Sequence, residues 1–150
     1  GIGTGRLAIR TAPKCREFFG IDISPKTIEK TTENLAEYDN VSLICDDFLT
    51  HQFNRDFDVI YSSLTFMHIE EKQKAINKVA ALLKDGGRFV LSIDKNQSDT
   101  IDYGTRKIKI YPDNKEDIVK YITQSGMNLM KVFETDFAFV FIAEMKQNNS

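Results

Sequence analysis

The chain has 150 residues, 41% of them hydrophobic and 28% charged, with a formal net charge of −2. This composition is typical of a globular domain and excludes collagen-like and disordered chains. No apolar run approaches the roughly 20 residues of a membrane-spanning helix, so we expect no membrane partner and a cytoplasmic protein. There is no large basic excess, which disfavours nucleic acid as a partner. The cysteines lack metal-ligand spacing, so no metal site is expected.

The sequence opens on a glycine-rich loop, Gly1-Ile2-Gly3-Thr4-Gly5, followed by a short helix whose length Pro13 limits. No hydrophobic strand stands in front of this loop to deliver it to a sheet edge. We therefore expect that the first strand of the fold is missing from the chain and that the native protein is longer. Cys15, in the first helix, and Cys45, at the end of a later strand, are expected to be small buried hydrophobic residues.

Strands and helices then alternate along the chain. Residues 18–23 are predicted to form an apolar strand with an acid near its end, and Ser24-Pro25 can cap and open the next helix. Residues 41–45 are typical of a strand buried on both faces, and Asp46-Asp47-Phe48 follows its carboxyl end. Residues 57–62 repeat the strand pattern. This alternation predicts a parallel sheet with right-handed crossovers.

The clearest predicted helix covers residues 70–84. Its apolar face carries residues at helical spacing, namely Ile76, Val79, Ala80 and Leu83. Asp85-Gly86-Gly87 is expected to stop this helix, because glycine commonly ends helices. Residues 88–94 then alternate as a strand.

The last part of the chain changes character. Residues 113–125 are predicted to form a helix that Gly126 ends. The strands over residues 128–134 and 137–145 are joined only by Thr135-Asp136, which is too short for a parallel crossover. These two strands must therefore form an antiparallel hairpin.

Together these elements predict an α/β fold class. We expect a Rossmann-like, doubly wound, mostly parallel sheet that closes with a C-terminal antiparallel hairpin and lacks its first strand. Residues 1–150 are expected to form a single, N-terminally incomplete domain, in which residues 146–150 are a flexible tail.

Residues that follow the strands carry the candidate chemistry, because ligands of open α/β sheets bind beyond the carboxyl ends of the strands. They are the loop from Gly1 to Gly5, Asp22, Asp46-Asp47-Phe48 and Ser62-Ser63. Glycines let a ligand approach the backbone closely. Asp22, the acid at the end of the strand predicted over residues 18–23, can accept hydrogen bonds from a ribose diol. A nucleoside ligand is therefore implied. A dinucleotide site shares this pair of features, but its glycines follow GxGxxG, whereas this chain has GxGxG.

Five segments resemble, in order and in spacing, successive motifs of the class I S-adenosylmethionine-dependent methyltransferases of the small-molecule type. They are Gly-Ile-Gly-Thr-Gly-Arg-Leu-Ala, Gly-Ile-Asp-Ile-Ser, Cys-Asp-Asp-Phe, Phe-Asp-Val-Ile-Tyr-Ser-Ser and Leu-Leu-Lys-Asp-Gly-Gly-Arg-Phe. The resemblance covers nearly the whole chain, and the closing hairpin is similar to the family's reversed seventh strand. The chain departs from the family at its start, where the family has an apolar strand and an acidic residue two positions before the first glycine.

This resemblance implies S-adenosylmethionine as the cofactor and S-adenosylhomocysteine as its product. In the glycine-rich loop, Gly1, Gly3 and Gly5, with Thr4 between them, would line the methionine and ribose side of the cofactor. Asp22 would hold the ribose hydroxyls. Each of these positions also has a structural interpretation, since glycines serve tight turns and an aspartate can cap the following helix.

Four further contacts follow from the same resemblance. Ile23 would flank the adenine, and Asp47 would accept a hydrogen bond from the adenine amino group. The backbone amide of Phe48 would address a ring nitrogen. Ser62 and Ser63 match the stretch that faces the methionine amino group and the methyl-transfer site.

His68 is the candidate catalytic residue, because a histidine near the transfer site could take a proton from the accepting nucleophile. It could equally cap or pack beside the following helix. Alignment of donor and acceptor is expected to contribute most to this kind of displacement.

The sequence thus predicts an S-adenosylmethionine-dependent methyltransferase whose acceptor is a small molecule of unknown identity. The alternative is a degenerate or truncated domain that acts as a non-catalytic binding or partner subunit. A nicotinamide-dependent oxidoreductase is disfavoured by the glycine spacing and by the terminal hairpin. The oligomeric state cannot be predicted.

Overall fold

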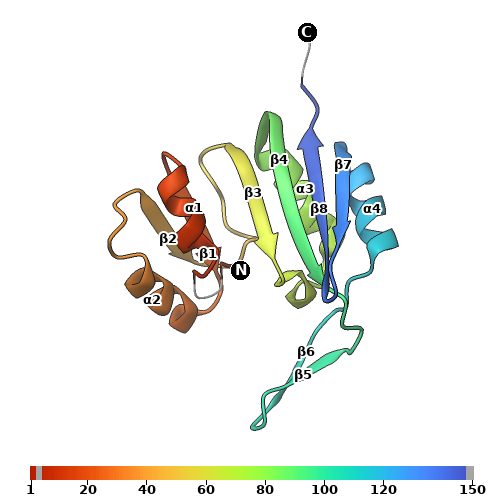
Figure 1. Cartoon of the computed structure of the whole chain (residues 1–150), viewed down its shortest axis with the longest axis horizontal. Helices are drawn as coiled ribbons and strands as arrows, with labels where there is room; N and C mark the ends of the chain where they lie inside the picture. Colours follow the sequence, from red (N-terminus) through yellow and green to blue (C-terminus); the bar gives the residue numbers. More distant parts are fainter. Residues whose placement is uncertain (3–4, 148–150) are drawn as a thin grey trace. The chain divides into compact units, whose positions relative to one another are not determined.

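The computed structural model describes residues 1–2 and 5–147 of the chain (Figure 1). The chain divides into two compact units, residues 1–52 and residues 53–150. Whether both belong to the single domain expected from the sequence stays a prediction, and so does the longer native protein. Among the described residues, no strand precedes β1 (Phe18–Asp22).

The first unit is built on a parallel pair of strands, β1 and β2 (Val41–Cys45). Phe18 lies opposite Val41 and Asp22 lies opposite Cys45, so both strands end at the same edge. Gly20 leaves room beside β1, because a Cβ atom at this position would collide with the side chain of Ile2. The start of the glycine-rich loop therefore lies against β1.

Short helices accompany these strands. α1 (Ala8–Thr11) passes into a 3-10 turn at Ala12–Lys14, which agrees with the short helix predicted from Pro13. α2 (Pro25–Asn34) begins at Ser24, whose hydroxyl accepts a hydrogen bond from the Thr27 amide at 3.3 Å. The predicted cap at Ser24-Pro25 is confirmed.

Two expectations about burial in this unit are wrong. Ser42 and Cys45 are exposed, and the other residues of β2 are only half-buried. β2 has β1 as its partner strand and packs mainly against α2, so it is not covered on both faces. Cys15 is also exposed, because it follows the 3-10 turn instead of lying inside a helix.

The second unit contains a four-stranded sheet in the order β3-β4-β8-β7. β3 (Phe57–Ser63) and β4 (Leu83–Asp94) run parallel, and β8 (Ala138–Met145) pairs antiparallel with β4. β7 (Met127–Glu134) pairs antiparallel with β8, which confirms the predicted C-terminal hairpin. The core is centred on side chains that are at most 1% exposed, including Phe89, Leu91, Ile93 and Phe141.

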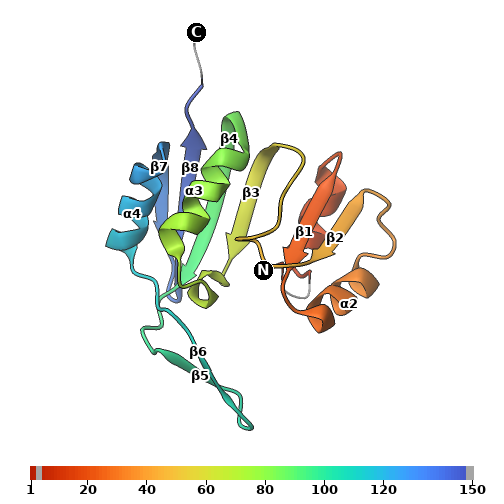
Figure 2. The same ribbon diagram turned by 180° about the vertical axis from the view of Figure 1, so that it is seen from behind.

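Two longer helices cover one face of this sheet (Figure 2). α3 (Lys72–Leu82) buries Ile76, Val79 and Ala80, as their helical spacing predicts. α4 (Lys115–Gln124) begins at Asn114, whose side chain accepts a hydrogen bond from the Asp117 amide. Its fully buried residues are Ile118 and Ile122.

The boundary between α3 and β4 differs from the prediction. The helix ends at Leu82, before the glycines, and β4 begins at Leu83, which pairs with Phe57 of β3. Pairing with a distant strand thus ends the helix earlier than the local glycine signal does. Gly86 still adopts a φ of +74°, a backbone conformation that favours glycine.

A separate two-stranded ribbon leaves the second unit between β4 and α4 (Figure 1). β5 (Thr100–Asp102) pairs antiparallel with β6 (Lys107–Lys109), and the turn between them contains Gly104 at a φ of +83°. Tyr103 at this turn is 56% exposed.

Candidate functional site

The glycine-rich segment lies beside the end of β1. The Ile2 amide donates to the Ile21 carbonyl at 3.2 Å, which holds the start of this segment against β1. Gly5 is buried with a φ of +87°, and a Cβ atom there would lie 3.1 Å from Thr31. A glycine is therefore needed at this position, where the chain turns tightly against α2. The predicted positions Gly3 and Thr4 lie outside the described residues.

Asp22 is oriented by the turn into α2. Its Oδ1 atom accepts a hydrogen bond from the Ser24 amide at 3.0 Å. The following residue, Ile23, is 69% exposed and presents an apolar side chain at the same edge of the strand pair. The interpretation of Asp22 as the cap of the following helix is wrong, because Ser24 caps α2. The hydrogen bond from the Ser24 amide orients the Asp22 carboxylate.

The acidic segment after β2 is tied directly to the end of β1. The Asp46 amide donates to the Asp22 carbonyl at 3.0 Å, which brings the two strand ends together. Asp46 also accepts from the Asp47 amide at 2.8 Å, and its Oδ2 atom lies 2.8 Å from Nδ1 of His51. Asp46 therefore organises this loop, and the choice of Asp47 as the ligand-facing acid stays a prediction.

Asp47 and Phe48 are both half-buried. The Leu49 amide donates to Asp47 Oδ1 at 2.9 Å, so the Asp47 carboxylate is held by its own turn. The contact of His51 with Asp46 is a feature that the sequence interpretation missed. The available signal was an acid and a histidine separated by one short loop.

Ser62 and Ser63 end β3 in the second unit. The Ser62 hydroxyl shares a hydrogen bond of 3.2 Å with the Thr65 hydroxyl, and Ser63 lies opposite Ser92 of β4. Between them and Thr65, Leu64 adopts a φ of +55° and is 46% exposed. A positive φ at a non-glycine residue is strained, and such strain is often found at functional sites.

His68 closes a 3-10 turn, Phe66–His68, in the same segment. Its amide donates to the Thr65 carbonyl at 3.1 Å, while its side chain is exposed. The two preceding residues of the turn, Phe66 and Met67, are buried. The structure thus places His68 at the surface, a few residues after Ser62 and Ser63.

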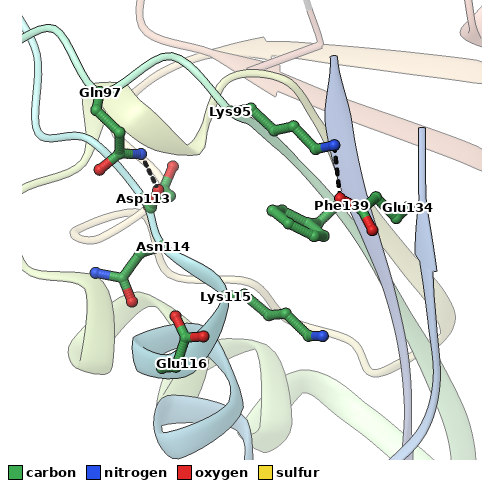
Figure 3. A pocket seen from close by; sticks show the side chains of 8 residues that line it. All are labelled: Lys95, Gln97, Asp113, Asn114, Lys115, Glu116, Glu134 and Phe139. Carbon is green, nitrogen blue, oxygen red and sulfur yellow. Dashed lines mark hydrogen bonds and ion pairs between the residues drawn. The ribbon is translucent and has the colours of Figure 1, made fainter. Parts of the chain in front are cut away.

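An open groove of about 330 Å³ lies beyond the carboxyl end of β4 (Figure 3). Lys95 Nζ lies 2.8 Å from Glu134 Oε1 and 4.9 Å from the centre of the Phe139 ring, and Lys115 Nζ approaches the same ring at 5.8 Å. Hydrogen bonding to Lys95 and its positive charge lower the pKa of Glu134. The sequence analysis did not single out these residues, although Lys95 directly follows a strand.

Two further observations concern metals and membranes. Within residues 1–2 and 5–147, no group of three or more His, Cys, Asp or Glu side chains could hold a metal ion. No helix in the same part of the chain has both the length and the apolar composition to cross a membrane.

Solved structures define the class of fold. The chain aligns over 97% of its length with an S-adenosylmethionine-dependent methyltransferase from Clostridium acetobutylicum, with a TM-score of 0.80, 17% identity and 81% of that chain covered. An N-methyltransferase from Bradyrhizobium japonicum in complex with S-adenosylhomocysteine gives a TM-score of 0.74 at 15% identity, covering 95% of this chain and 73% of that one. The predicted Rossmann-like α/β methyltransferase fold is confirmed.

The family model described as "Methyltransferase domain" matches residues 1–136. The chain therefore belongs to this methyltransferase-domain family, as its sequence motifs predict.

Curated relatives are similar over part of the chain. The chain is 30% identical over 78 residues to malonyl-[acyl-carrier protein] O-methyltransferase 1 of Ilyobacter polytropus, covering 52% of this chain and 29% of that protein. It is 34% identical over 95 residues to an uncharacterized methyltransferase of Anoxybacillus flavithermus, covering 61% of this chain and 43% of that protein. The chain thus spans less than half the length of these relatives.

Proposed function

We propose that this chain binds S-adenosylmethionine and takes part in methyl transfer to an acceptor molecule. The observation that carries the proposal is the hydrogen bond between the Asp46 amide and the Asp22 carbonyl. It gathers the ends of β1 and β2 at one edge, where nucleoside ligands of this architecture bind. Membership of the methyltransferase-domain family supports the same cofactor.

The groups at this edge suit the adenosine part of the cofactor. The Asp22 carboxylate, oriented by the Ser24 amide, is placed to accept hydrogen bonds from ribose hydroxyls. The exposed side chain of Ile23 offers an apolar surface for the adenine ring. Asp47 and the Phe48 amide would address the polar edge of adenine, and Gly1, Gly3, Thr4 and Gly5 would approach the methionine and ribose side.

In the second unit, Ser62 and Ser63 are proposed to face the methionine amino group. When bound, the cofactor supplies an electrophilic methyl group: the acceptor's lone pair bonds to the methyl carbon while the carbon–sulfur bond breaks, and sulfur leaves as the neutral thioether of S-adenosylhomocysteine. The protein's contribution is to align the two reactants and exclude water. His68 is proposed to take the acceptor's proton where the acceptor carries one.

The acceptor is proposed to be a small molecule that occupies the groove at the end of β4. Lys95 and Lys115 line this groove together with the carboxylates of Asp113, Glu116 and Glu134, so the charge of the groove does not by itself select the acceptor. Several relatives are named malonyl-[acyl-carrier protein] O-methyltransferases, so malonyl thioesters form the first panel of acceptors to test. The cytoplasmic location expected from the sequence remains a prediction.

Calorimetric titration with S-adenosylhomocysteine tests the cofactor assignment. Asp22→Asn keeps an oxygen for the Ser24 amide but removes the charge, so we expect affinity to fall roughly 10- to 100-fold, the range for a hydrogen bond to a charged group. Glu37→Gln, which changes an exposed carboxylate in the same unit, is the matched control and should bind like the wild type. Equal affinity of Asp22→Asn and wild type would reject the assignment.

Turnover separates the enzyme from a non-catalytic partner subunit. Transfer of a labelled methyl group to a member of the acceptor panel supports the enzyme. Saturable cofactor binding without transfer to any acceptor in the panel favours the binding subunit instead.

A further inference from the structure

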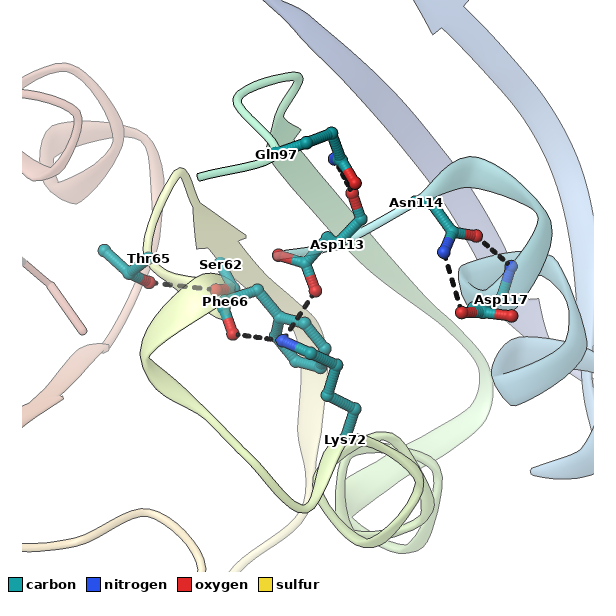
Figure 4. A network of polar contacts seen from close by, with 8 residues as sticks. All are labelled: Ser62, Thr65, Phe66, Lys72, Gln97, Asp113, Asn114 and Asp117. Atoms are coloured by element: carbon teal, nitrogen blue, oxygen red, sulfur yellow. Dashed lines mark hydrogen bonds and ion pairs between the residues drawn. The ribbon is translucent and has the colours of Figure 1, made fainter. Parts of the chain in front are cut away.

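A buried ion pair joins α3 to the segment before α4 in the second unit (Figure 4). Nζ of Lys72, the first residue of α3, lies 2.7 Å from Oδ1 of Asp113, which precedes α4. The two side chains are 9% and 1% exposed. Burial raises the pKa of Asp113, and Lys72 only partly opposes this effect.

Burying this ion pair in the core costs free energy. Removing two charges from water often costs as much free energy as their attraction returns, so well-packed apolar residues would serve stability equally well. Lys72 also stands in the first turn of a helix, where the helix dipole disfavours a positive charge. Stability alone therefore does not explain the pair, and its contacts indicate another role.

The contacts of Lys72 converge on the turn that follows β3. Its ammonium group donates to the Phe66 carbonyl at 3.0 Å and lies 5.0 Å from the centre of the Phe66 ring. The neighbouring Met67 carbonyl accepts from the Tyr111 amide at 2.7 Å, close to Asp113 in the chain. Consecutive carbonyls of the turn are thus bound by α3 and by the segment before α4.

The turn that these contacts hold is strained and carries candidate site residues. Leu64 has its positive φ here, and Ser62 bonds to Thr65 across the turn. A strained backbone persists only when its surroundings fix it. The ammonium of Lys72, itself fixed by Asp113, provides such a constraint for the segment that ends at His68.

We propose that Lys72, held by Asp113, is a positioning residue that fixes the turn over residues 64–68 and thereby sets Ser62, Ser63 and His68 for methyl transfer. The inference rests on the proposed function. Because Asp113 also lines the groove at the end of β4, the same pair links this turn to the place proposed for the acceptor.

The decisive variant replaces both charges, Lys72→Met together with Asp113→Leu. Either single change leaves a buried group without its partner and should lower the unfolding temperature by roughly 10 °C. The double change should recover most of this loss, because an apolar pair can replace a buried ion pair. The Phe66 carbonyl nevertheless stays without its donor.

Two measurements on the full chain then separate positioning from stability. In the double variant, amide hydrogen exchange at His68 and Ile69 should rise about tenfold, while the β4 amides keep their wild-type rates. Affinity for S-adenosylhomocysteine should fall about fivefold or more at a near-native unfolding temperature. The control is Lys84→Gln with Asp58→Asn, which removes an exposed ion pair of the same unit and should change neither quantity.

Wild-type exchange in the turn, or an equal increase throughout the unit, would overturn the inference, as would unchanged cofactor affinity despite a loosened turn. If the wild type itself does not bind S-adenosylhomocysteine, the proposed function fails. Selective loosening of the turn would then still support the role of Lys72 in holding it.

Discussion

The two units hold their candidate site residues in different ways. In the first unit, hydrogen bonds from backbone amides position the site residues: the Ser24 amide orients Asp22, and the Asp46 amide joins the ends of β1 and β2. In the second unit, the turn after β3 is strained at Leu64 and is held by a buried ion pair from distant parts of the chain. The Ser24 contact is local in the sequence and the Asp46 contact continues the parallel pairing of β1 with β2, whereas the turn of the second unit depends on side-chain packing between α3 and the segment before α4.

The largest effect is expected in the second unit. Lys72→Met alone leaves Asp113 buried without its cation and should lower the free energy of unfolding by about 3 to 5 kcal/mol. Lys84→Met, which breaks an exposed ion pair, should cost less than about 1 kcal/mol. Urea denaturation measures both. Similar losses for the two variants would show that the buried pair holds the second unit no more firmly than an exposed pair does.

The next effect belongs to the first unit. In Gly20→Ala the new methyl group meets the side chains of Ile2 and Leu43, and overpacking of this kind typically costs about 1 to 3 kcal/mol. The variant should also displace the glycine-rich segment and weaken binding of S-adenosylhomocysteine. Ser42→Ala, which adds no atom at an exposed position of β2, is the control. Wild-type stability of Gly20→Ala would contradict crowding by Ile2 and Leu43.

A smaller loss is expected when the helix cap of α2 is removed. Ser24→Ala deletes the hydroxyl that accepts from the Thr27 amide and should cost about 1 kcal/mol. Ser42→Ala, at an exposed position of β2, serves as the comparison. The stability losses of the two variants are compared by thermal unfolding, monitored by circular dichroism. No difference between the two variants would mean that the cap adds nothing to the local organisation of Asp22.

The smallest effect concerns pH. Because burial raises the pKa of Asp113 above the ordinary value of 3.8, the folded state binds this proton more tightly than the unfolded state. The contribution of Asp113 to stability is therefore fully present below pH 3.8 and is lost as pH rises through the folded pKa. The stability of the wild type relative to Asp113→Asn should fall across this window in denaturation series. A rising difference would show that Lys72 outweighs burial.

Much of the fold could be predicted because its signals are local. Apolar periodicity located α3 and the strands, and the length of the connection required the β7–β8 hairpin to be antiparallel. The end of α3 could not be predicted in the same way, since it depends on the pairing of Leu83 with Phe57. The exposure of Cys45 likewise depends on which elements cover β2.

The residues of the candidate site also divide into those with a local sequence signal and those that depend on tertiary packing. Asp22 and Ser62 lie at the ends of strands and Asp47 follows one, and the end of a strand can be found in a sequence. Lys72 and Asp113 are far apart in the chain and lie in unremarkable polar surroundings of the sequence. Only the packing of α3 beside the segment before α4 makes them partners.

The β5–β6 ribbon has a consequence for how the chain can be divided. A two-stranded ribbon has little stability of its own, and its exposed tip at Tyr103 and Gly104 is where a protease should cut first. The pieces on either side of that cut are joined elsewhere by the antiparallel pairing of β4 with β8 from Arg88 to Asp94. We therefore expect the second unit to survive nicking at this tip, and to reassemble from two separately produced fragments.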